Sequence, residues 1–328
     1  MLIVILGEHN DPQVRHMHSA IAASGATPVI ADTADFGHAW RLSMNPATGD
    51  GEIVFNDKTV CLSDIHSVYW HRYRTPRPAS VHSNTSLHAP NTASALHSWF
   101  LLPDTRWINP LGALQYHQCK PVQLMHAYRL GATIPSTWTG NAPAQANVFC
   151  QSSGALIIKP VKGGTTAKRT SAAAVKRHLS EAPVTLQVFV PGTNIRTYVF
   201  GSEAVHIQLD SDDVDYRTDQ HVTPVTTRVP PRINALSVQI CEAFGMYWCA
   251  IDWRLTPAGE YVFLEANPCP YFLYVENTTG LDLTGRLLKL LTATASAAAP
   301  AKASAPPPAV QRLPALENKA GQVFVVDQ

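Results

Sequence analysis

The stretches that decide the fold are AIDWR at residues 250–254 and YVFLEANP at residues 261–268. Apolar and polar residues alternate in both stretches, which predicts two half-buried strands. The segment TPAG at residues 256–259 lies between them and has the composition of a hairpin loop. Together the three segments predict a β-hairpin.

This hairpin brings two carboxylates and an amide to one face. Pairing Leu255 with Glu260 makes Asp252 and Glu265 diagonal neighbours on adjacent strands, close enough to reach one ion. Carboxylate and amide oxygens form a hard ligand set that suits Mg²⁺, usually bound together with phosphates. An ordinary solvated hairpin is the alternative. The expected polar face carries Asp252, Phe263, Glu265 and Asn267, and the expected apolar face carries Ile251, Trp253, Val262, Leu264 and Ala266.

Length and composition indicate a globular protein of two or three subdomains. The chain has 328 residues, of which 45% are hydrophobic and 15% charged. Its formal net charge of +1 lacks the positive excess that is typical of nucleic-acid-binding proteins. The apolar runs are too short to span a membrane, and residues 1–6 lack the features of a signal peptide. Six scattered cysteines without metal-type spacing indicate reduced thiols in the cytoplasm.

The N-terminal part predicts an open α/β domain that begins with a βαβ unit. One strand of this domain ends in a basic and aromatic run that contains Arg72 and Arg74. Strand ends in such sheets often meet ligands, so both arginines are candidate substrate contacts, although a solvated basic loop fits equally well. We expect strands at 2–6, 28–31 and 67–71, with a helix at 11–24.

The rest of the chain alternates further helices and strands and ends in a low-complexity tail. Alanine and proline dominate residues 297–308, which is typical of a linker without a core. The apolar run at 322–326 is either a docking strand or part of a disordered tail. We expect helices at 111–130, 171–179, 232–244 and 281–291, strands at 184–190, 195–200 and 204–209, and a loop at 210–224.

Two lysines and a glycine-containing loop precede the hairpin. Lys159 ends a predicted strand just before Gly163 and Gly164, so its ammonium and the loop amides could approach the same phosphate oxygens. This is not a P-loop, because the lysine precedes the glycines and no GKS or GKT follows. Lys120 offers a second cation from another element, although a solvated surface charge is the simpler reading of either lysine alone.

The order of these motifs resembles that of the ATP-grasp superfamily. The chain is similar to its peptide- and protein-modifying branch, which includes ribosomal-protein glutamate ligases and the microviridin-type (graspetide) macrocyclases. The resemblance covers residues 2–292. The motifs that carry it are Lys120, Lys159-Pro160-x-x-Gly163-Gly164, Gln187-x-Phe189-Val190-x-Gly192-x-Asn194-Ile195-Arg196, Asp252 and Glu265-x-Asn267-Pro268.

The resemblance implies an α/β ATP-grasp fold and a ligase that uses ATP and Mg²⁺. ATP would phosphorylate a substrate carboxylate, and an amine or a hydroxyl would then displace phosphate to form an amide or an ester. The implied domains are an N-terminal open α/β domain at 1–118, a central ATP-grasp subdomain at 119–190, a C-terminal subdomain with the metal site at 191–292, and a linker and tail at 293–328.

The same resemblance assigns roles to single residues. Arg196 would stabilise the acyl phosphate, with a structural salt bridge as the alternative, and Lys159 would share in catalysis and phosphate binding. The metal ligands would be Asp252, Glu265 and Asn267. The nucleotide contacts would be Lys120, Lys159, Gly163, Gly164, Gln187, Val188, Phe189, Val190 and Asn194.

The chain departs from its relatives at three places. Family members often carry an acidic residue where Val188 stands, and usually Asp where Asn194 stands near the ribose. Pro268-Cys269-Pro270-Tyr271-Phe272 replaces the more usual Pro-Ser-Gly-Gln-Phe beside the metal site, so selection of the acceptor is expected to differ. Arg217 lies where related enzymes meet their peptide, which makes it a candidate clamp for the substrate carboxylate.

The expected partner is a precursor peptide with a leader and a core, and a homodimer is left open. Two alternatives compete with this hypothesis. One is a stand-alone ligase of small amino acids, similar to the D-alanine–D-alanine ligases. The other is a catalytically silent peptide-binding relative, against which the lysines and the predicted metal ligands speak. Neither nucleic acid nor a membrane is expected as a partner.

Overall fold

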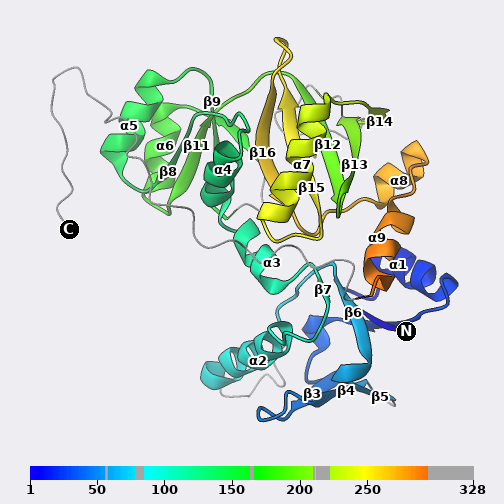
Figure 1. Ribbon diagram of the computed structural model, residues 1–328. Coiled ribbons are helices and arrows are strands. Elements are labelled where there is room, and N and C mark those ends of the chain that lie inside the picture. Colours follow the sequence, from blue (N-terminus) through cyan, green and yellow to red (C-terminus); the bar gives the residue numbers. More distant parts are fainter. Residues whose placement is uncertain (56–57, 78–84, 163–165, 210, 212–221, 295–328) are drawn as a thin grey trace.

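The computed structural model describes residues 1–55, 58–77, 85–162, 166–209, 211 and 222–294 (Figure 1). In these residues the chain forms mixed helices and sheets, which confirms the predicted α/β class. No helix within the described ranges has both the length and the apolar character that a membrane span requires.

The chain begins with the predicted βαβ unit, which belongs to a parallel sheet of order β2-β1-β6-β7. Ile3 and Ile5 of β1 pack against α1 and α9, whereas Val4 and Leu6 face an aromatic cluster on the other side. Both faces are covered, which explains the uninterrupted apolar run. The elements are β1 (Leu2–Leu6), α1 (Pro12–Ala23), β2 (Thr27–Ala31), β6 (Ile65–Trp70), β7 (Trp107–Ile108) and α9 (Leu283–Thr292).

The second face of this sheet is covered by a layer that the sequence patterns did not indicate. A three-stranded antiparallel sheet and a long helix enclose Trp40 and Trp99, whose ring centroids lie 5.9 Å apart. The strands are short and the helix contains Pro90, so neither shows a clear hydrophobic period. The elements are η1 (Thr33–Asp35), β3 (Trp40–Met44), β4 (Gly51–Phe55), β5 (Lys58–Cys61), η2 (Leu62–Asp64) and α2 (Thr85–Phe100).

The helix expected at 111–130 is in fact two helices, α3 (Leu111–His117) and α4 (Lys120–Arg129). Cys119 adopts a non-helical conformation with φ −99° and ψ 59°. Pro121 is the reason, because a continuous helix would need an N–H at residue 121 to bond the His117 carbonyl, and proline lacks this N–H and its ring clashes with that carbonyl. The break turns Lys120 into the first residue of a new helix.

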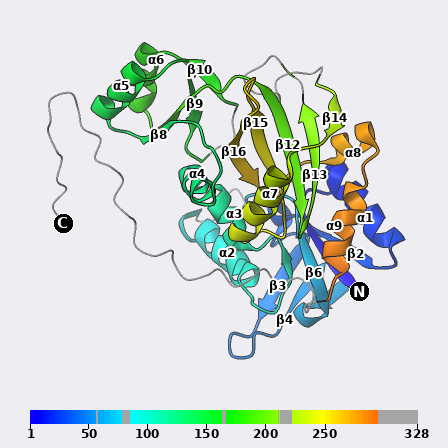
Figure 2. The same cartoon turned by 45° about the horizontal axis from the view of Figure 1, so that its top comes forward.

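The central part is an antiparallel sheet of order β10-β9-β11-β8 with two helices packed on it (Figure 2). The strand expected at 184–190 ends at Val188, and Pro191-Gly192 then leads into the next sheet. Gly192 has φ 138°, and a Cβ there would collide with the backbone of Leu255. The elements are β8 (Thr137–Gly140), α5 (Pro143–Ser152), β9 (Leu156–Pro160), β10 (Lys168–Thr170), α6 (Ala172–Leu179) and β11 (Val184–Val188).

The C-terminal part is an antiparallel sheet of order β14-β13-β12-β15-β16. Helix α7 covers one face, and the other face packs toward the N-terminal domain and α9 (Figure 1). The predicted helices near 232–244 and 281–291 correspond to α7 and α9, and the predicted strands near 195–200 and 204–209 to β12 and β13. The remaining elements are β12 (Thr193–Phe200), β13 (Glu203–Leu209), β14 (Pro224–Thr227), α7 (Pro231–Ala243), β15 (Trp248–Leu255), β16 (Tyr261–Asn267) and α8 (Leu273–Thr279).

The hairpin β15–β16 forms as predicted, but its register is wrong in the sequence-based interpretation. Leu255 pairs with Tyr261, and a bulge lies between Asp252 and Trp253. The bulge turns Phe263 to the apolar face, where its ring packs 5.6 Å from that of Trp253. It also places Asp252 directly opposite Glu265 rather than diagonally. An extra residue in one strand reverses the alternation beyond it, and residue types alone do not reveal its position.

One buried glutamine ties the N-terminal domain to the segment that follows the hairpin. Gln13 of α1 has no exposed surface. Its amide nitrogen donates to the Tyr69 hydroxyl and the Pro270 carbonyl, and its amide oxygen accepts from the N–H groups of Phe272 and Leu273. The N-terminal domain and the segment at residues 270–273 therefore share a core that depends on a polar side chain.

Replacing Gln13 with leucine should lower the free energy of unfolding by about 2–5 kcal/mol, because it leaves several buried polar groups without partners. Chemical denaturation measures this loss. Gln115→Leu, an exposed position on α3, is the matched control and should change the free energy by less than about 0.5 kcal/mol. Equal effects of the two substitutions would contradict the structural role of Gln13.

Candidate functional site

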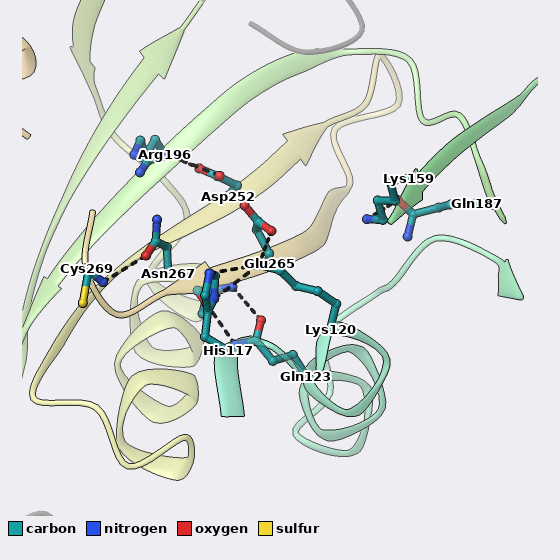
Figure 3. Close-up of polar contacts among 11 residues, drawn as sticks. His117, Lys120, Gln123, Lys159, Gln187, Arg196, Asp252, Glu265, Asn267 and Cys269 are labelled. Atoms are coloured by element: carbon teal, nitrogen blue, oxygen red, sulfur yellow. Dashed lines mark hydrogen bonds and ion pairs between the residues drawn. The ribbon is translucent and has the colours of Figure 1, made fainter. Parts of the chain in front are cut away.

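The candidate site lies where the hairpin β15–β16 faces α4 and the central sheet (Figure 3). Asp252 and Glu265 are direct cross-strand partners, and Asn267 follows two residues later on β16. The two carboxylates and the amide thus come together as predicted, although through a different register. Each of the three already has a partner within the chain.

Glu265 is paired with Lys120. The ammonium of Lys120 lies 2.5 Å from Glu265 Oε2, and the lysine side chain is only 9% exposed. Burial by itself would raise the pKa of the Glu265 carboxyl, but the attraction and hydrogen bond of Lys120 outweigh it and hold this pKa far below its usual value. Lys159 of the central sheet lowers it further. Glu265 is therefore a carboxylate at neutral pH.

His117 of α3 completes this cluster. Its Nδ1 lies 2.7 Å from the Ala266 carbonyl, and the Lys120 ammonium lies 3.2 Å from each ring nitrogen. Burial, followed by the nearby Lys120 charge, lowers the pKa of His117 to about 4. The imidazole is thus neutral at pH 7. With Nδ1 donating to the carbonyl, Nε2 is the acceptor that remains for the ammonium.

Gln123 of α4 fixes the strand that carries Glu265. Its amide nitrogen donates to the Ala266 carbonyl at 2.9 Å, and its amide oxygen accepts from the Ala266 N–H at 3.2 Å. β16 is the edge strand of its sheet, so this buried side chain takes the place of a neighbouring strand. The helix and the hairpin are thereby held together at the site.

Asp252 is paired with Arg196, which lies opposite it on β12. Arg196 Nη1 is 2.8 Å from Oδ1 and 3.1 Å from Oδ2 of Asp252. Arg196 Nε donates to the Tyr198 hydroxyl, which donates in turn to the Tyr271 carbonyl. The guanidinium is thus held in one orientation beside a candidate metal ligand. A permanently charged, forked group suits an anion that forms there.

The segment after Asn267 is held by side chains from three parts of the chain. Asn267 accepts from the Cys269 N–H at 2.9 Å. Asn109 donates to the Pro268 carbonyl, while Gln13 and Tyr198 bind the two carbonyls that follow Cys269. Residues 268–272, where the chain departs from its relatives, therefore form a fixed wall beside the carboxylates.

The central sheet contributes the predicted lysine and glutamine. Lys159 donates to Gln187, whose amide donates to Thr137, and Figure 3 shows both residues facing the hairpin. Phe189, near the end of the predicted adenine strand, has the guanidinium groups of Arg169 and Arg254 over its ring, 4.3 and 5.9 Å from the centroid. The N–H groups of Val188 and Phe189 donate to main-chain carbonyls, and the Asn194 amide donates to the Leu209 carbonyl.

The remaining predicted contacts, to the substrate and to the nucleotide, have different outcomes. Arg74 is paired with Asp32 and with Glu8, at 2.8 and 3.2 Å, which ties it to the N-terminal domain rather than to the carboxylates. Arg72 is exposed at the end of β6. Gly163, Gly164 and Arg217 lie outside the described residues, as do most of the loop expected at 210–224 and the tail from residue 295. These roles stay predictions.

The donor set fits Mg²⁺. Asp252 and Glu265 supply hard carboxylate oxygens from opposed positions, and Asn267 supplies an amide oxygen on the same strand as Glu265. Within the described ranges, no three His, Cys, Asp or Glu side chains gather into a metal-type cluster, so the ligand set here consists of two carboxylates and an amide. Mg²⁺ prefers octahedral coordination, so two carboxylates leave several coordination positions for water or phosphate oxygens. This is typical of Mg²⁺ that is bound together with phosphates.

Comparisons with known proteins bear on the fold. No family model matches the sequence. The macrocyclase MdnC of Microcystis aeruginosa, solved with its precursor peptide MdnA, superposes with a TM-score of 0.78 at 19% identity, over 89% of this chain and 99% of that chain. The chain has the ATP-grasp fold.

Two structures of ATP-grasp ligases also superpose on this chain. The ligase PsnB, solved with a phosphomimetic variant of its minimal precursor, Mg and ADP, has a TM-score of 0.75 and 22% identity over 88% of this chain and 97% of that chain. A RiPP-associated ATP-grasp ligase of Chryseobacterium gregarium, in complex with ADP and a leader and core peptide, has a TM-score of 0.78 and 17% identity, with coverage of 88% and 96%.

Curated proteins match the sequence over a shorter stretch. A probable alpha-L-glutamate ligase of Citrobacter koseri is 26% identical over 178 residues, which is 49% of this chain and 59% of the relative. A ribosomal protein bS6–L-glutamate ligase of Salmonella newport is 26% identical over 179 residues with the same coverage. The chain thus spans less than two thirds of the curated relatives it matches.

The sequence patterns missed several residues of the site. His117 and Gln123 were expected within one long helix at 111–130, and Tyr198 was expected within an apolar strand; none of them was assigned a role. A spacing signal existed for His117, which lies three residues before Lys120 and would share a helical face with it. Only the contact with Ala266, far away in sequence, gives it a role.

The low pKa of His117 has a consequence for stability. An unfolded chain binds a proton at His117 near pH 6.5, whereas the folded chain does so only near pH 4. The free energy of unfolding should therefore fall as the pH drops from about 6.5 to 4, with a His117 contribution on the order of 2–3 kcal/mol. In Mg²⁺- and nucleotide-free buffer, His117→Phe should flatten this slope; an unchanged slope would contradict it.

Proposed function

We propose that the protein is an ATP-dependent carboxylate–amine or carboxylate–hydroxyl ligase that modifies a ribosomally made precursor peptide. The observation that carries the proposal is the opposition of Asp252 and Glu265 on a hairpin of the ATP-grasp fold, with Lys120 and Arg196 paired to them. The similarity to ligases solved with precursor peptides, ADP and Mg supports the peptide substrate and the use of ATP and Mg²⁺.

The charges of the site suit phosphoryl transfer to a carboxylate. Asp252, Glu265 and Asn267 would hold Mg²⁺, which would supply positive charge to the phosphates of ATP. Lys120 and Lys159 approach from two different elements and would bind the same phosphates. Arg196 is fixed by Asp252 and Tyr198, so its guanidinium would meet the charge that builds up on the acyl phosphate without reorganising.

In the second half of the reaction, the wall at residues 268–272 would orient the acceptor. An amine or hydroxyl of the peptide would attack the acyl carbon, release inorganic phosphate and lose its proton, which forms an amide or an ester. The wall is held by Gln13, Asn109 and Tyr198, so the acceptor would approach a rigid surface. This rigidity favours orientation of a bound nucleophile.

A ligase of single amino acids remains the second candidate, because the curated relatives are glutamate ligases. We further propose a cytoplasmic location, where the six free cysteines would stay reduced. A homodimer would fit either function.

The decisive experiment incubates the protein with ATP, Mg²⁺ and two kinds of substrate, short acidic peptides and free amino acids, followed by mass spectrometry. Each new ester or amide within a peptide removes one water, about 18 Da by stoichiometry, with one ADP formed per bond. A gain of phosphate would identify a kinase. Product from free amino acids alone would favour the second candidate.

Removal of either carboxylate should abolish Mg²⁺-dependent formation of ADP. We expect Asp252→Asn and Glu265→Gln to lower the turnover at least about 100-fold, because charge at the transferring phosphates would no longer be neutralised. Glu260→Gln is the matched control on the same hairpin, because the Glu260 carboxylate accepts a hydrogen bond from the Thr133 hydroxyl at the surface; it should leave turnover unchanged. Full turnover in Glu265→Gln would contradict the metal assignment.

Arg196→Lys keeps the charge but loses the fork that binds Asp252 and Tyr198 together. Turnover should fall at least about 10-fold, whereas the ADP dissociation constant should change less than about 3-fold, because the guanidinium is assigned to the transition state. Steady-state kinetics and calorimetry measure the two quantities. Equal losses in both would make Arg196 structural.

A further inference from the structure

We propose that His117 is a positioning residue that holds the Lys120 ammonium on Glu265, where the ammonium takes the place of a metal until a nucleotide draws it away. The proposal rests on the proposed function, because it concerns how the nucleotide and Mg²⁺ would enter the same site. It adds a residue and an order of events to that function.

The contacts of Lys120 differ from those of a surface ion pair. Its side chain is 9% exposed, and its ammonium is 2.5 Å from Glu265 and 3.2 Å from both ring nitrogens of His117. A buried ammonium is costly unless its hydrogen bonds are satisfied, so this arrangement is a defined binding place for one cation.

His117 is fixed by the strand that carries Glu265. Its Nδ1 binds the carbonyl of Ala266, the next residue after Glu265, and Gln123 holds the same peptide unit from the other side. The ring therefore keeps Nε2 turned to the ammonium. Removal of the imidazole would leave the ammonium attached to Glu265 alone.

The ammonium and a divalent cation compete for Glu265. Both would use the same carboxylate, and two positive charges a few ångström apart repel each other. Phosphate oxygens offer the ammonium another partner, and lysine reaches it by rotation about its four-carbon chain. The metal should thus bind weakly without nucleotide and tightly with it, and by linkage the metal should strengthen nucleotide binding equally.

The experiment measures Mn²⁺ binding by electron paramagnetic resonance, with and without ADP. The variants are Lys120→Met and His117→Phe, and Arg129→Met is the matched control, since it removes an exposed cation from the last turn of α4. Without ADP, Lys120→Met should bind Mn²⁺ at least about 10-fold more tightly than the wild type, and His117→Phe at least about 2-fold. Arg129→Met should match the wild type.

Gain of affinity is a readout that damage to the fold would not produce. Asp252→Asn in the Lys120→Met background should remove the gain, which locates the ion at the hairpin. Equal or weaker Mn²⁺ binding by both Lys120→Met and His117→Phe, with circular dichroism spectra like the wild type, would overturn the proposal. If Lys120→Met does not fold, His117→Phe decides alone.

The ADP arm separates this proposal from the proposed function. Tight binding of ADP with Mn²⁺ by the wild type, without any gain in the two variants, would overturn the role of His117 and Lys120 only. Failure of the wild type to bind ADP with Mn²⁺ would overturn the proposed nucleotide site itself.

Discussion

The site depends on the pairing of Asp252 with Glu265 across the hairpin β15–β16. A bulge beside Asp252 sets this pairing and at the same time turns Phe263 into the core. Two carboxylates in direct opposition repel each other, and the structure compensates each one with its own cation, Arg196 or Lys120. The cations come from β12 and α4, so the charges of the pair join the hairpin to two further elements of the fold.

Polar side chains hold the main chain around these carboxylates in place. Gln123 and His117 hold the Ala266 peptide unit, and Gln13 and Asn109 hold the wall that follows Asn267. Each of these side chains binds main-chain groups that a strand or helix leaves without partners. Side chains and main chain that are already fixed lose little conformational freedom when a ligand binds. A site that stabilises a short-lived anion requires groups fixed in this way.

Much of this could be predicted from the sequence, and for identifiable reasons. The strand β1, the βαβ unit and the hairpin follow local hydrophobic patterns, and Lys120, Lys159, Arg196, Asp252 and Glu265 follow motif order. The break at Pro121 follows a local rule, whereas the bulge depends on the register of the hairpin and His117 contacts a residue 149 positions away. The aromatic layer around Trp40 was not predicted, because short strands show little hydrophobic periodicity.

The central claim is that Asp252 and Glu265 hold one divalent cation together with a nucleotide. The most direct measurement is a crystal structure with ADP and Mn²⁺, located by its anomalous scattering. The account predicts a peak within about 2.5 Å of oxygens from both carboxylates and from the phosphates, with the Lys120 ammonium moved from Glu265 to a phosphate. A peak that contacts neither carboxylate, with ADP bound elsewhere, would contradict it.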